Sequence, residues 1–377
     1  MTLADSLKAE CLAKGLRYVG GRGDPHSPCW VLGEAPGEHE EQALLPFIGP
    51  SGREQDRMMS EAGFKPHECY FTNPYKVRPP DNDLSKLETL GIQKPIYEAA
   101  FLEELRTYHP AIIICAGATS LSLLCPILCN KRGELPISKY RGSLLTSPLF
   151  DWSHYVIPVY HPAFILREWT ERQVSVFCYA RAKEELSYWR KNGKLQPLPE
   201  RQFLTEPSYE DTHDYLSTIL QGTERVSIDI EMLQRKHVST IGLAKSPNSA
   251  ISFGLYDFKS LDQTAKIWRL LDRILRNKRQ IGQNYVNFDC CWLESIGFQP
   301  RLDLVEDTLI RHHILWPELE HSLQFMTIQY TRQPFYKNEG RKWVPRDGKA
   351  ALQRYNAMDC AVTYEVYLRQ EEEFVER

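Results

Sequence analysis

Five side chains in the second half of the sequence have the types and spacing needed to hydrolyse a phosphodiester bond. Asp229 and Glu231 stand two positions apart, and Asp289 lies in a later segment. Tyr355 and Asp359 stand four positions apart near the end of the sequence. Carboxylate oxygens are the ligands that Mg²⁺ and Mn²⁺ prefer, and two such ions can polarise an attacking water and stabilise a leaving oxygen. The pattern therefore predicts a two-ion hydrolytic site, with the four carboxylates as ligands and the tyrosine beside the water.

The segments around these residues predict elements that can bring them together. VSIDIEM (226–232) alternates apolar and polar residues and predicts a strand, on which Asp229 and Glu231 share one face. Two carboxylates on one face repel each other unless a cation lies between them. The competing interpretation is an edge strand with solvated acids, whose apolar residues form the buried face.

The later segments favour the metal site. YNAMDCAVTYEVY (355–367) has helical character, so Tyr355 and Asp359 share a helix face. Asp289 lies in an apolar stretch and requires a partner or a metal. We expect Asp307 to cap the helix that follows it.

Residues 205–377 resemble the 3′–5′ proofreading exonuclease domain of family A DNA polymerases of the phage type, in the tyrosine subclass of the DEDD superfamily. The resemblance implies a ribonuclease H-like α/β domain with a mixed sheet, and Mg²⁺ or Mn²⁺ as two bound ions. It implies that one ion is held tightly, that Asp289 belongs to the site of the second ion, and that Tyr355 orients the water. The tightly held ion would be bound by Asp229, Glu231 and Asp359. Asn284 stands five positions before Asp289, where the family usually has four.

The first half of the sequence carries a second group of motifs. Predicted strands end at GEAPG, at the TN segment (70–83), within AIIICAGATSLSLL (111–124) and at the HPA segment (156–168). GEAPG (33–37) follows an apolar run, and PFIG, TN and HPA follow in that order. Strand ends of an open α/β sheet form ligand sites, so these motifs predict one pocket. A base pocket suits the side chains: Phe47 can stack on a flipped pyrimidine and Asn73 can bind its edge. His161 can stabilise the leaving base, and Glu34 can assist the water or the sugar.

These motifs resemble those of family 4 uracil-DNA glycosylases, over about residues 8–190, which implies an α/β/α sandwich. That family binds an iron–sulfur cluster through four cysteines. Here Cys11 is followed by Lys14 where the second cysteine is expected, and Val77 and Glu98 stand at the other two positions. We therefore expect no iron–sulfur cluster. The pocket is either an active glycosylase site or a scaffold kept for binding DNA.

Composition sets limits on the class of protein. The chain has 377 residues, which is enough for two domains, and a formal net charge of −3. DNA binding would then depend on local clusters of basic residues rather than on overall charge. The ten cysteines form no disulfide pattern, and no signal peptide or membrane span is evident. We expect a cytoplasmic protein, in the host cytoplasm if it is viral, with no membrane partner.

We predict two α/β domains, at 1–192 and 207–377, joined by a linker at 193–206 that is interrupted by Gly and Pro. The sequence stops soon after the third acidic motif, where the resembling polymerases continue into a polymerising domain. The expected function is 3′–5′ DNA exonuclease activity on single-stranded 3′ ends or primer-templates, beside a separate family A polymerase subunit. The alternatives are a bifunctional glycosylase and exonuclease, a non-catalytic DNA-binding replicase subunit, and an RNA 3′ exonuclease.

Overall fold

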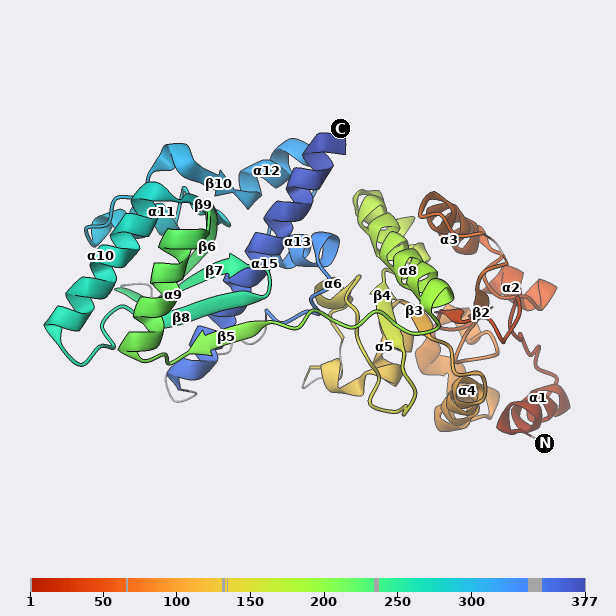
Figure 1. Ribbon diagram of the computed structural model, residues 1–377. Helices are drawn as coiled ribbons and strands as arrows, with labels where there is room; N and C mark the ends of the chain where they lie inside the picture. Colours follow the sequence, from red (N-terminus) through yellow and green to blue (C-terminus); the bar gives the residue numbers. More distant parts are fainter. Residues whose placement is uncertain are drawn as a thin grey trace. The chain divides into compact units, whose positions relative to one another are not determined.

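The computed structural model describes all residues except 1, 66, 131–132, 134, 234–236, 338–347 and 377. The chain divides into two compact units, Met1–Pro197 and Leu198–Arg377. Each unit contains its own sheet with helices packed against it (Figure 1). Both are α/β, as the sequence predicts.

The sheet of the first unit consists of four parallel strands in the order β2-β1-β3-β4. The strands are β1 (Cys29–Leu32), β2 (Tyr70–Thr72), β3 (Ile112–Ala116) and β4 (Tyr155–Val159). Every residue of the four strands is buried, which is why each reads as a short apolar run rather than an alternating one. Because the strands are parallel, their carboxyl ends meet at one edge of the sheet.

Helices cover both faces of this sheet, with α3 and α8 on one side and α4 and α5 on the other (Figure 1). The α-helices of this unit are α1 (Leu3–Ala13), α2 (Glu38–Ala43), α3 (Pro50–Glu61), α4 (Lys94–Tyr108), α5 (Ala118–Leu124), α6 (Ile137–Tyr140), α7 (Pro162–Ile165) and α8 (Arg172–Asn192). The 3₁₀ turns are η1 (Pro80–Asn82), η2 (Leu84–Leu90), η3 (Pro126–Leu128) and η4 (Trp169–Glu171). This arrangement is the α/β/α sandwich that the sequence predicts.

The sheet of the second unit is mixed, with six strands in the order β10-β9-β6-β7-β8-β5. The strands are β5 (Gln202–Thr205), β6 (Arg225–Leu233), β7 (His237–Ser246), β8 (Ser249–Gly254), β9 (Arg279–Gly282) and β10 (Val305–Asp307). The β6, β7 and β8 strands form an antiparallel meander, whereas β5, β9 and β10 join in parallel. The prediction of a mixed-sheet second domain is confirmed.

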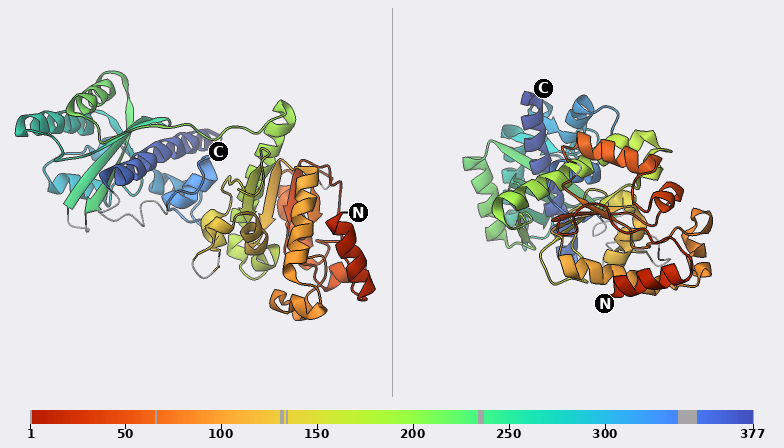
Figure 2. Two further views of the ribbon diagram at one scale, coloured as in Figure 1. Left: turned by 90° about the horizontal axis from the view of Figure 1, so that it is seen from below. Right: turned by 90° about the vertical axis from the view of Figure 1, so that its right-hand side faces the viewer.

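Helices pack on both faces of the mixed sheet. They are α9 (Tyr209–Gly222), α10 (Leu261–Asn277), α11 (Asp289–Ser295), α12 (Thr308–Leu315), α13 (Leu323–Tyr330) and α15 (Lys349–Glu376), with the 3₁₀ turn η5 (Leu302–Leu304). Helices α9 and α10 share one apolar core with the strands, and α15 lies along the opposite face (Figure 2, left). No helix in the described part of the chain is both long enough and apolar enough to span a bilayer.

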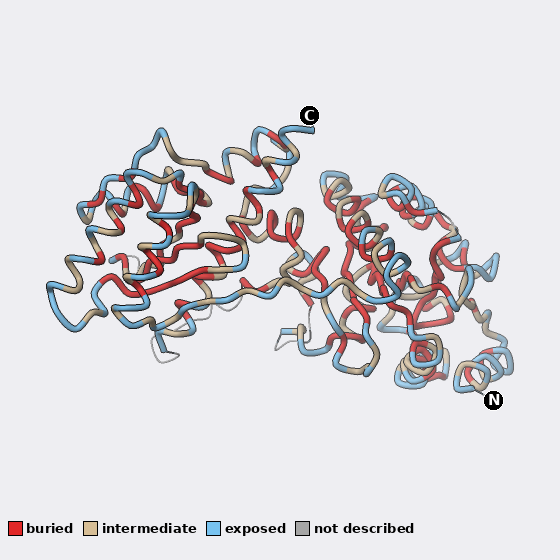
Figure 3. The backbone as a smooth tube through the Cα atoms, viewed as in Figure 1, coloured by how far each residue is buried: buried red, intermediate tan, exposed pale blue. Residues whose placement is uncertain are grey.

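One predicted boundary is wrong. Residues 193–206 were expected to be a linker, but Gln202–Thr205 form β5, which pairs with β8 at the edge of the second sheet. Exposed and half-buried residues alternate along β5, and Phe203 packs against the core beneath α15. In Figure 3 the middle strands of this sheet are mostly buried, whereas β5 has no buried residue. This edge strand resembles a loop in sequence because it has only four residues and its apolar pair, Phe203 and Leu204, does not alternate with polar residues.

Candidate functional site

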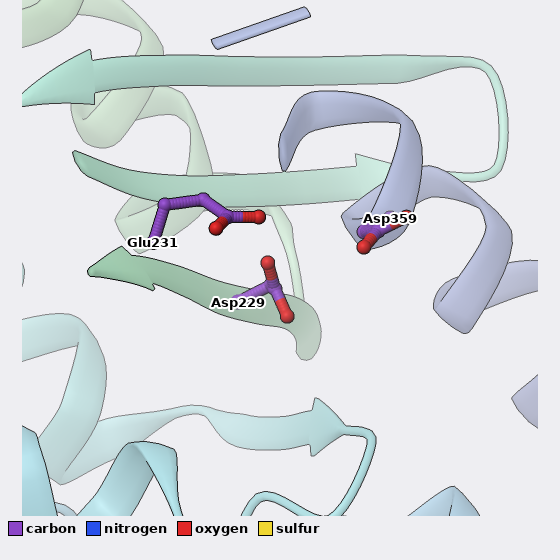
Figure 4. Close-up of side chains that lie close together, drawn as sticks. All are labelled: Asp229, Glu231 and Asp359. Carbon is purple, nitrogen blue, oxygen red and sulfur yellow. The ribbon is translucent and has the colours of Figure 1, made fainter. Parts of the chain in front are cut away.

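Three carboxylates converge in the second unit, between strand β6 and helix α15. Ligand oxygens of Asp229, Glu231 and Asp359 all lie within 4.8 Å of one another. Figure 4 shows Asp229 and Glu231 on the same side of β6, with Asp359 reaching them from α15. Asp359 is buried, and the other two are half-buried. The group has the donor chemistry of a site for a hard divalent cation.

The alternation along β6 explains why the acids face α15. Val226, Ile228 and Ile230 point to the opposite face and enter the core that α9 and α10 cover. Asp229 and Glu231 therefore point toward α15. The helix can approach closely because β7 has glycine at position 242, where a Cβ would lie 2.4 Å from the Oδ1 atom of Asn356.

Two further contacts hold the strand carboxylates and connect them to the rest of the site. The Asn356 side chain donates to Oδ2 of Asp229 at 2.7 Å and accepts from the Ser252 hydroxyl at 2.7 Å. Asp289, at the start of α11, accepts from the backbone N–H of Ile230 at 3.0 Å. Asp289 is buried, with 3% of its surface exposed, and burial followed by the charge of Asp229 raises its pKa. It adjoins the group of three carboxylates without belonging to it.

Both carboxylate oxygens of Asp359 contact polar side chains from the segment before α15. The Tyr336 hydroxyl donates to Oδ1 at 2.7 Å, and the Lys337 ammonium lies 2.6 Å from Oδ2. The same ammonium lies 3.2 Å from the hydroxyl of Tyr355, one turn before Asp359 on α15. Lys337 therefore contacts both the Tyr355 hydroxyl and the Asp359 carboxylate.

Burial and the proximity of other acids raise the pKa values of Asp229 and Glu231. Burial and then the charge of Asp359 raise the pKa of Asp229, and Lys337 and the Asn356 hydrogen bond oppose this effect. Burial and then Asp229 and Asp359 raise the pKa of Glu231. Burial also raises the pKa of Tyr355, which keeps its hydroxyl protonated. Ionising Asp229 and Glu231 together carries an energetic cost that additional positive charge in the site would reduce.

The structure therefore places all five predicted residues in one region, and it adds three that the sequence did not indicate. Asn356, Tyr336 and Lys337 contact the predicted acids, yet no motif spacing marks them. Asn284 does not touch these acids in any hydrogen bond found within the described residues; its backbone N–H donates to Asp307 at 3.0 Å. Asp307 also caps α12, as predicted, by accepting from the N–H of Leu309.

Three histidines lie together, with His312 and His313 on α12 and His321 in the segment that follows it. His312 Nδ1 is 2.8 Å from His321 Nδ1, and His313 Nδ1 is 3.0 Å from His321 Nε2. His312 is also 2.9 Å from the Gln329 side chain. Because His321 uses both ring nitrogens within this chain of contacts, the three rings do not converge on one point as metal ligands would.

The first unit holds a separate pocket at the carboxyl edge of its parallel sheet. Its volume is about 590 Å³, and its lining includes Glu34, Phe47, Asn73 and His161. Glu34, Asn73 and His161 follow β1, β2 and β4, and Phe47 follows α2, so three of the four strand ends contribute to the lining. A pocket of this volume is large enough for a nucleobase and part of its sugar.

Glycines and a buried acid shape this pocket. A Cβ on Gly33 would lie 2.4 Å from the Asn73 amide oxygen and 2.7 Å from the Phe47 ring. Buried Glu40 accepts from the N–H groups of Ile48 at 3.1 Å and Gly49 at 2.7 Å, and from Gly37 at 3.1 Å. One carboxylate thus ties the GEAPG loop to the PFIG loop.

His161 and Glu34 are oriented by neighbouring groups. His161 Nδ1 accepts from the N–H of Ala163 at 3.2 Å, which leaves Nε2 as the protonated nitrogen of the neutral ring. Burial lowers the pKa of His161, while the charge of Glu34 opposes this. The Glu34 carboxylate accepts from the Thr119 hydroxyl on α5. Gly117 has φ +106°, and a Cβ there would lie 3.3 Å from the His161 side chain.

The residues at the expected iron–sulfur positions do not fit a cluster. Cys11 is fully buried in an apolar group that includes Val77, Leu87 and Tyr97. Glu98 accepts from the Tyr75 hydroxyl at 2.7 Å. Lys14 lies 3.8 Å from Glu10 at the surface. The four positions offer one thiol, an isopropyl group, a carboxylate and an ammonium, which is not a donor set for iron and sulfide.

One basic residue near the pocket motifs is unsuited to contact DNA. Lys76 is buried, 2.9 Å from Glu104 and 2.5 Å from the Thr72 hydroxyl. Arg167, in contrast, lines the pocket. Of these two side chains, only Arg167 is placed where it could contact a phosphate near the pocket.

Comparisons with known proteins agree with the geometry of the first unit. The family model for the uracil DNA glycosylase superfamily matches residues 21–190. The type-4 uracil-DNA glycosylase of Saccharolobus solfataricus is 33% identical over 170 residues, which are 45% of this chain and 76% of that protein. The enzyme of Thermotoga maritima is 29% identical over 151 residues, 40% of this chain and 71% of that protein.

For solved structures, the Nibbler EXO domain of Aedes aegypti aligns with a TM-score of 0.38 and 14% identity, over 46% of this chain and 88% of that domain. Through its first unit, the chain belongs to the uracil DNA glycosylase superfamily.

Proposed function

We propose that the second unit is a metal-dependent 3′–5′ DNA exonuclease. The observation that supports this most directly is the convergence of Asp229, Glu231 and Asp359, whose ligand oxygens lie within 4.8 Å of one another. Half-buried and buried acids at this separation oppose one another unless cations neutralise them. Membership of the first unit in a DNA glycosylase superfamily favours DNA over RNA as the substrate.

The three converging carboxylates and Asp289 would hold two Mg²⁺ or Mn²⁺ ions. When bound, such ions supply an activated water and stabilise the leaving 3′ oxygen. The chain itself orients the reactants: Asn356 holds the Asp229 carboxylate through a 2.7 Å hydrogen bond. Tyr355 presents a protonated hydroxyl next to the acids, suited to position the attacking water.

The test uses a 3′-recessed DNA duplex, labelled at its 5′ end, that contains one internal uracil. Wild type with Mg²⁺ is expected to produce a ladder that shortens from the 3′ end. The ladder should disappear in EDTA and in Asp229→Asn. A ladder that persists in either control would rule out this acidic site as the source of the activity.

We propose as a second function that the first unit excises uracil. Its support is that Glu34, Phe47, Asn73 and His161 line one pocket of about 590 Å³, in a unit related to uracil-DNA glycosylases. In this reaction water replaces the base at C1′ of the sugar, and the base leaves with the bonding electrons. The Nε2–H of His161 would donate a hydrogen bond to the departing base. An alkali-labile break at the uracil, present in EDTA and absent in His161→Ala, is the expected product.

The proposal includes a place for the exonuclease at primer ends, next to a separate family A polymerase. Its support is the order of the acidic motifs, which resembles that of polymerase proofreading domains. Addition of a family A polymerase from the native host should stimulate removal of a mismatched 3′ nucleotide over a matched one. If the chain binds DNA but forms neither a ladder nor an alkali-labile break, a non-catalytic accessory role replaces both proposals.

A further inference from the structure

Lys337 occupies a position that a cation would be expected to take in the acidic site. Its Nζ atom lies 2.6 Å from Oδ2 of Asp359 and 3.2 Å from the hydroxyl of Tyr355. The residue is largely buried, with 9% of its surface exposed. It therefore contacts both residues that α15 contributes to the proposed reaction.

Distances show that this ammonium and a metal ion cannot share Asp359 Oδ2 comfortably. Mg²⁺ lies about 2.1 Å from its carboxylate ligands. With Lys337 Nζ at 2.6 Å from the same oxygen, the two cations would lie less than about 5 Å apart. At such a separation, away from bulk water, a divalent ion and an ammonium repel each other strongly.

The remaining oxygen of Asp359 is hydrogen-bonded as well: Oδ1 accepts from the Tyr336 hydroxyl at 2.7 Å, and the Lys337 charge lies on the same carboxylate. Both oxygens of this carboxylate are therefore bound by residues of the segment that precedes α15. A metal ion on Oδ2 would place two like charges on one oxygen, which favours displacement of Lys337. The neutral Tyr336 hydroxyl can remain, because each carboxylate oxygen has two lone pairs.

We propose that Lys337 is an internal counter-ion that neutralises the acidic site before metal binds and competes with metal for Asp359. The inference deepens the proposed exonuclease function and rests on its metal site. Displacement of Lys337 would also release its contact with Tyr355. Metal loading and the freedom of the Tyr355 hydroxyl are then coupled through one side chain, so the nuclease becomes competent only when the ions are in place.

The test measures Mn²⁺ binding to the full chain by electron paramagnetic resonance, which detects the free ion without any need for activity. Lys337→Met should bind Mn²⁺ more tightly than wild type, by roughly fivefold or more, the lower end of typical coupling between two sites. Lys349→Met is the matched control, because Lys349 lies 2.5 Å from Asp257 with 65% of its side chain exposed. This control should bind Mn²⁺ as wild type does.

Unchanged or weaker Mn²⁺ binding by Lys337→Met would overturn the competition. If that variant does not fold, Lys337→Gln keeps a polar end in the same place, and the same two outcomes apply. Asp359→Asn distinguishes a failure of the Lys337 competition from a failure of the metal site. Binding that Asp359→Asn abolishes but Lys337→Met does not tighten refutes the Lys337 inference alone. If neither wild type nor Lys337→Met binds Mn²⁺, the proposed metal site itself fails.

Discussion

Asp229→Asn should stabilise the metal-free protein while it removes nuclease activity. The pKa of Asp229 is raised from 3.8 to about 7, first by burial and then by Asp359. A folded-state pKa above the unfolded value means that stability is lost as pH rises from about 4 to about 7. Above that range the ionised carboxylate lowers the free energy of unfolding by its full amount. Asparagine has the same shape and can still accept from Asn356, so it removes the penalty and keeps the contact.

The magnitude follows from the same pKa values. At 1.36 kcal/mol for each pKa unit, the rise from 3.8 to about 7 corresponds to roughly 4 kcal/mol. Asp229 is half-buried, so solvent reduces this, and we expect Asp229→Asn to gain about 1–2 kcal/mol.

The assay is urea unfolding of the second unit at about pH 8, in EDTA and again with Mn²⁺. In EDTA the variant should unfold at higher urea than wild type. With Mn²⁺ the order should reverse, because ions that bind the folded state stabilise wild type more. Asp257→Asn is the control: this residue pairs with Lys349 at the surface, and we expect a change within about 0.5 kcal/mol. An Asp229→Asn variant that is less stable than wild type in EDTA would refute the reasoning about crowded charge.

Five other outcomes are expected. Tyr355→Phe should keep Mn²⁺ affinity and lower single-turnover cleavage by roughly 10–100-fold, because only water positioning is lost; unchanged cleavage would remove the tyrosine from that role. His161→Ala should abolish any uracil release, measured as free base, while the 3′ ladder remains. Leu87→Ala should destabilise the first unit by about 2–5 kcal/mol, because it leaves a cavity in the apolar group around Cys11. The control Leu12→Ala, at the exposed surface, should change the stability little. The purified protein should contain no iron and show no absorbance from an iron–sulfur cluster. Burial lowers the pKa of His312, so the stability present above about pH 6.5 should fall as pH drops below it, which thermal unfolding at pH 5.5 and 7.5 can measure in wild type and in His312→Gln.

Local rules were enough to predict where the acids of the second unit point. Alternation along a strand puts Asp229 and Glu231 on one face, and helical spacing puts Tyr355 and Asp359 on one face. Both periodicities are properties of the backbone and can be read without knowledge of the fold. The burial of Ile228 and Ile230 on the other face of β6 shows the same alternation from the apolar side.

The convergence of strand ends in the first unit was also predictable from sequence, because four apolar runs each end in a turn motif. Parallel strands bring their carboxyl ends to one edge, and the sheet order β2-β1-β3-β4 does so here. Mismatched cysteine positions indicated the loss of the cluster donors. Only the fold showed what replaces them, since the apolar group around Cys11 draws on residues from α1, η2 and α4.

Tertiary structure alone decided the contacts between segments far apart in the chain. Lys337 reaches Asp359, and Asn356 reaches Asp229 across 127 positions, at places where no local pattern marks the donor. The β5 strand was missed for a similar reason: its pairing with β8 depends on a partner more than forty positions later. Sequence periodicity determines which way a side chain faces, whereas the identity of the group that it meets depends on how the sheet and α15 pack together.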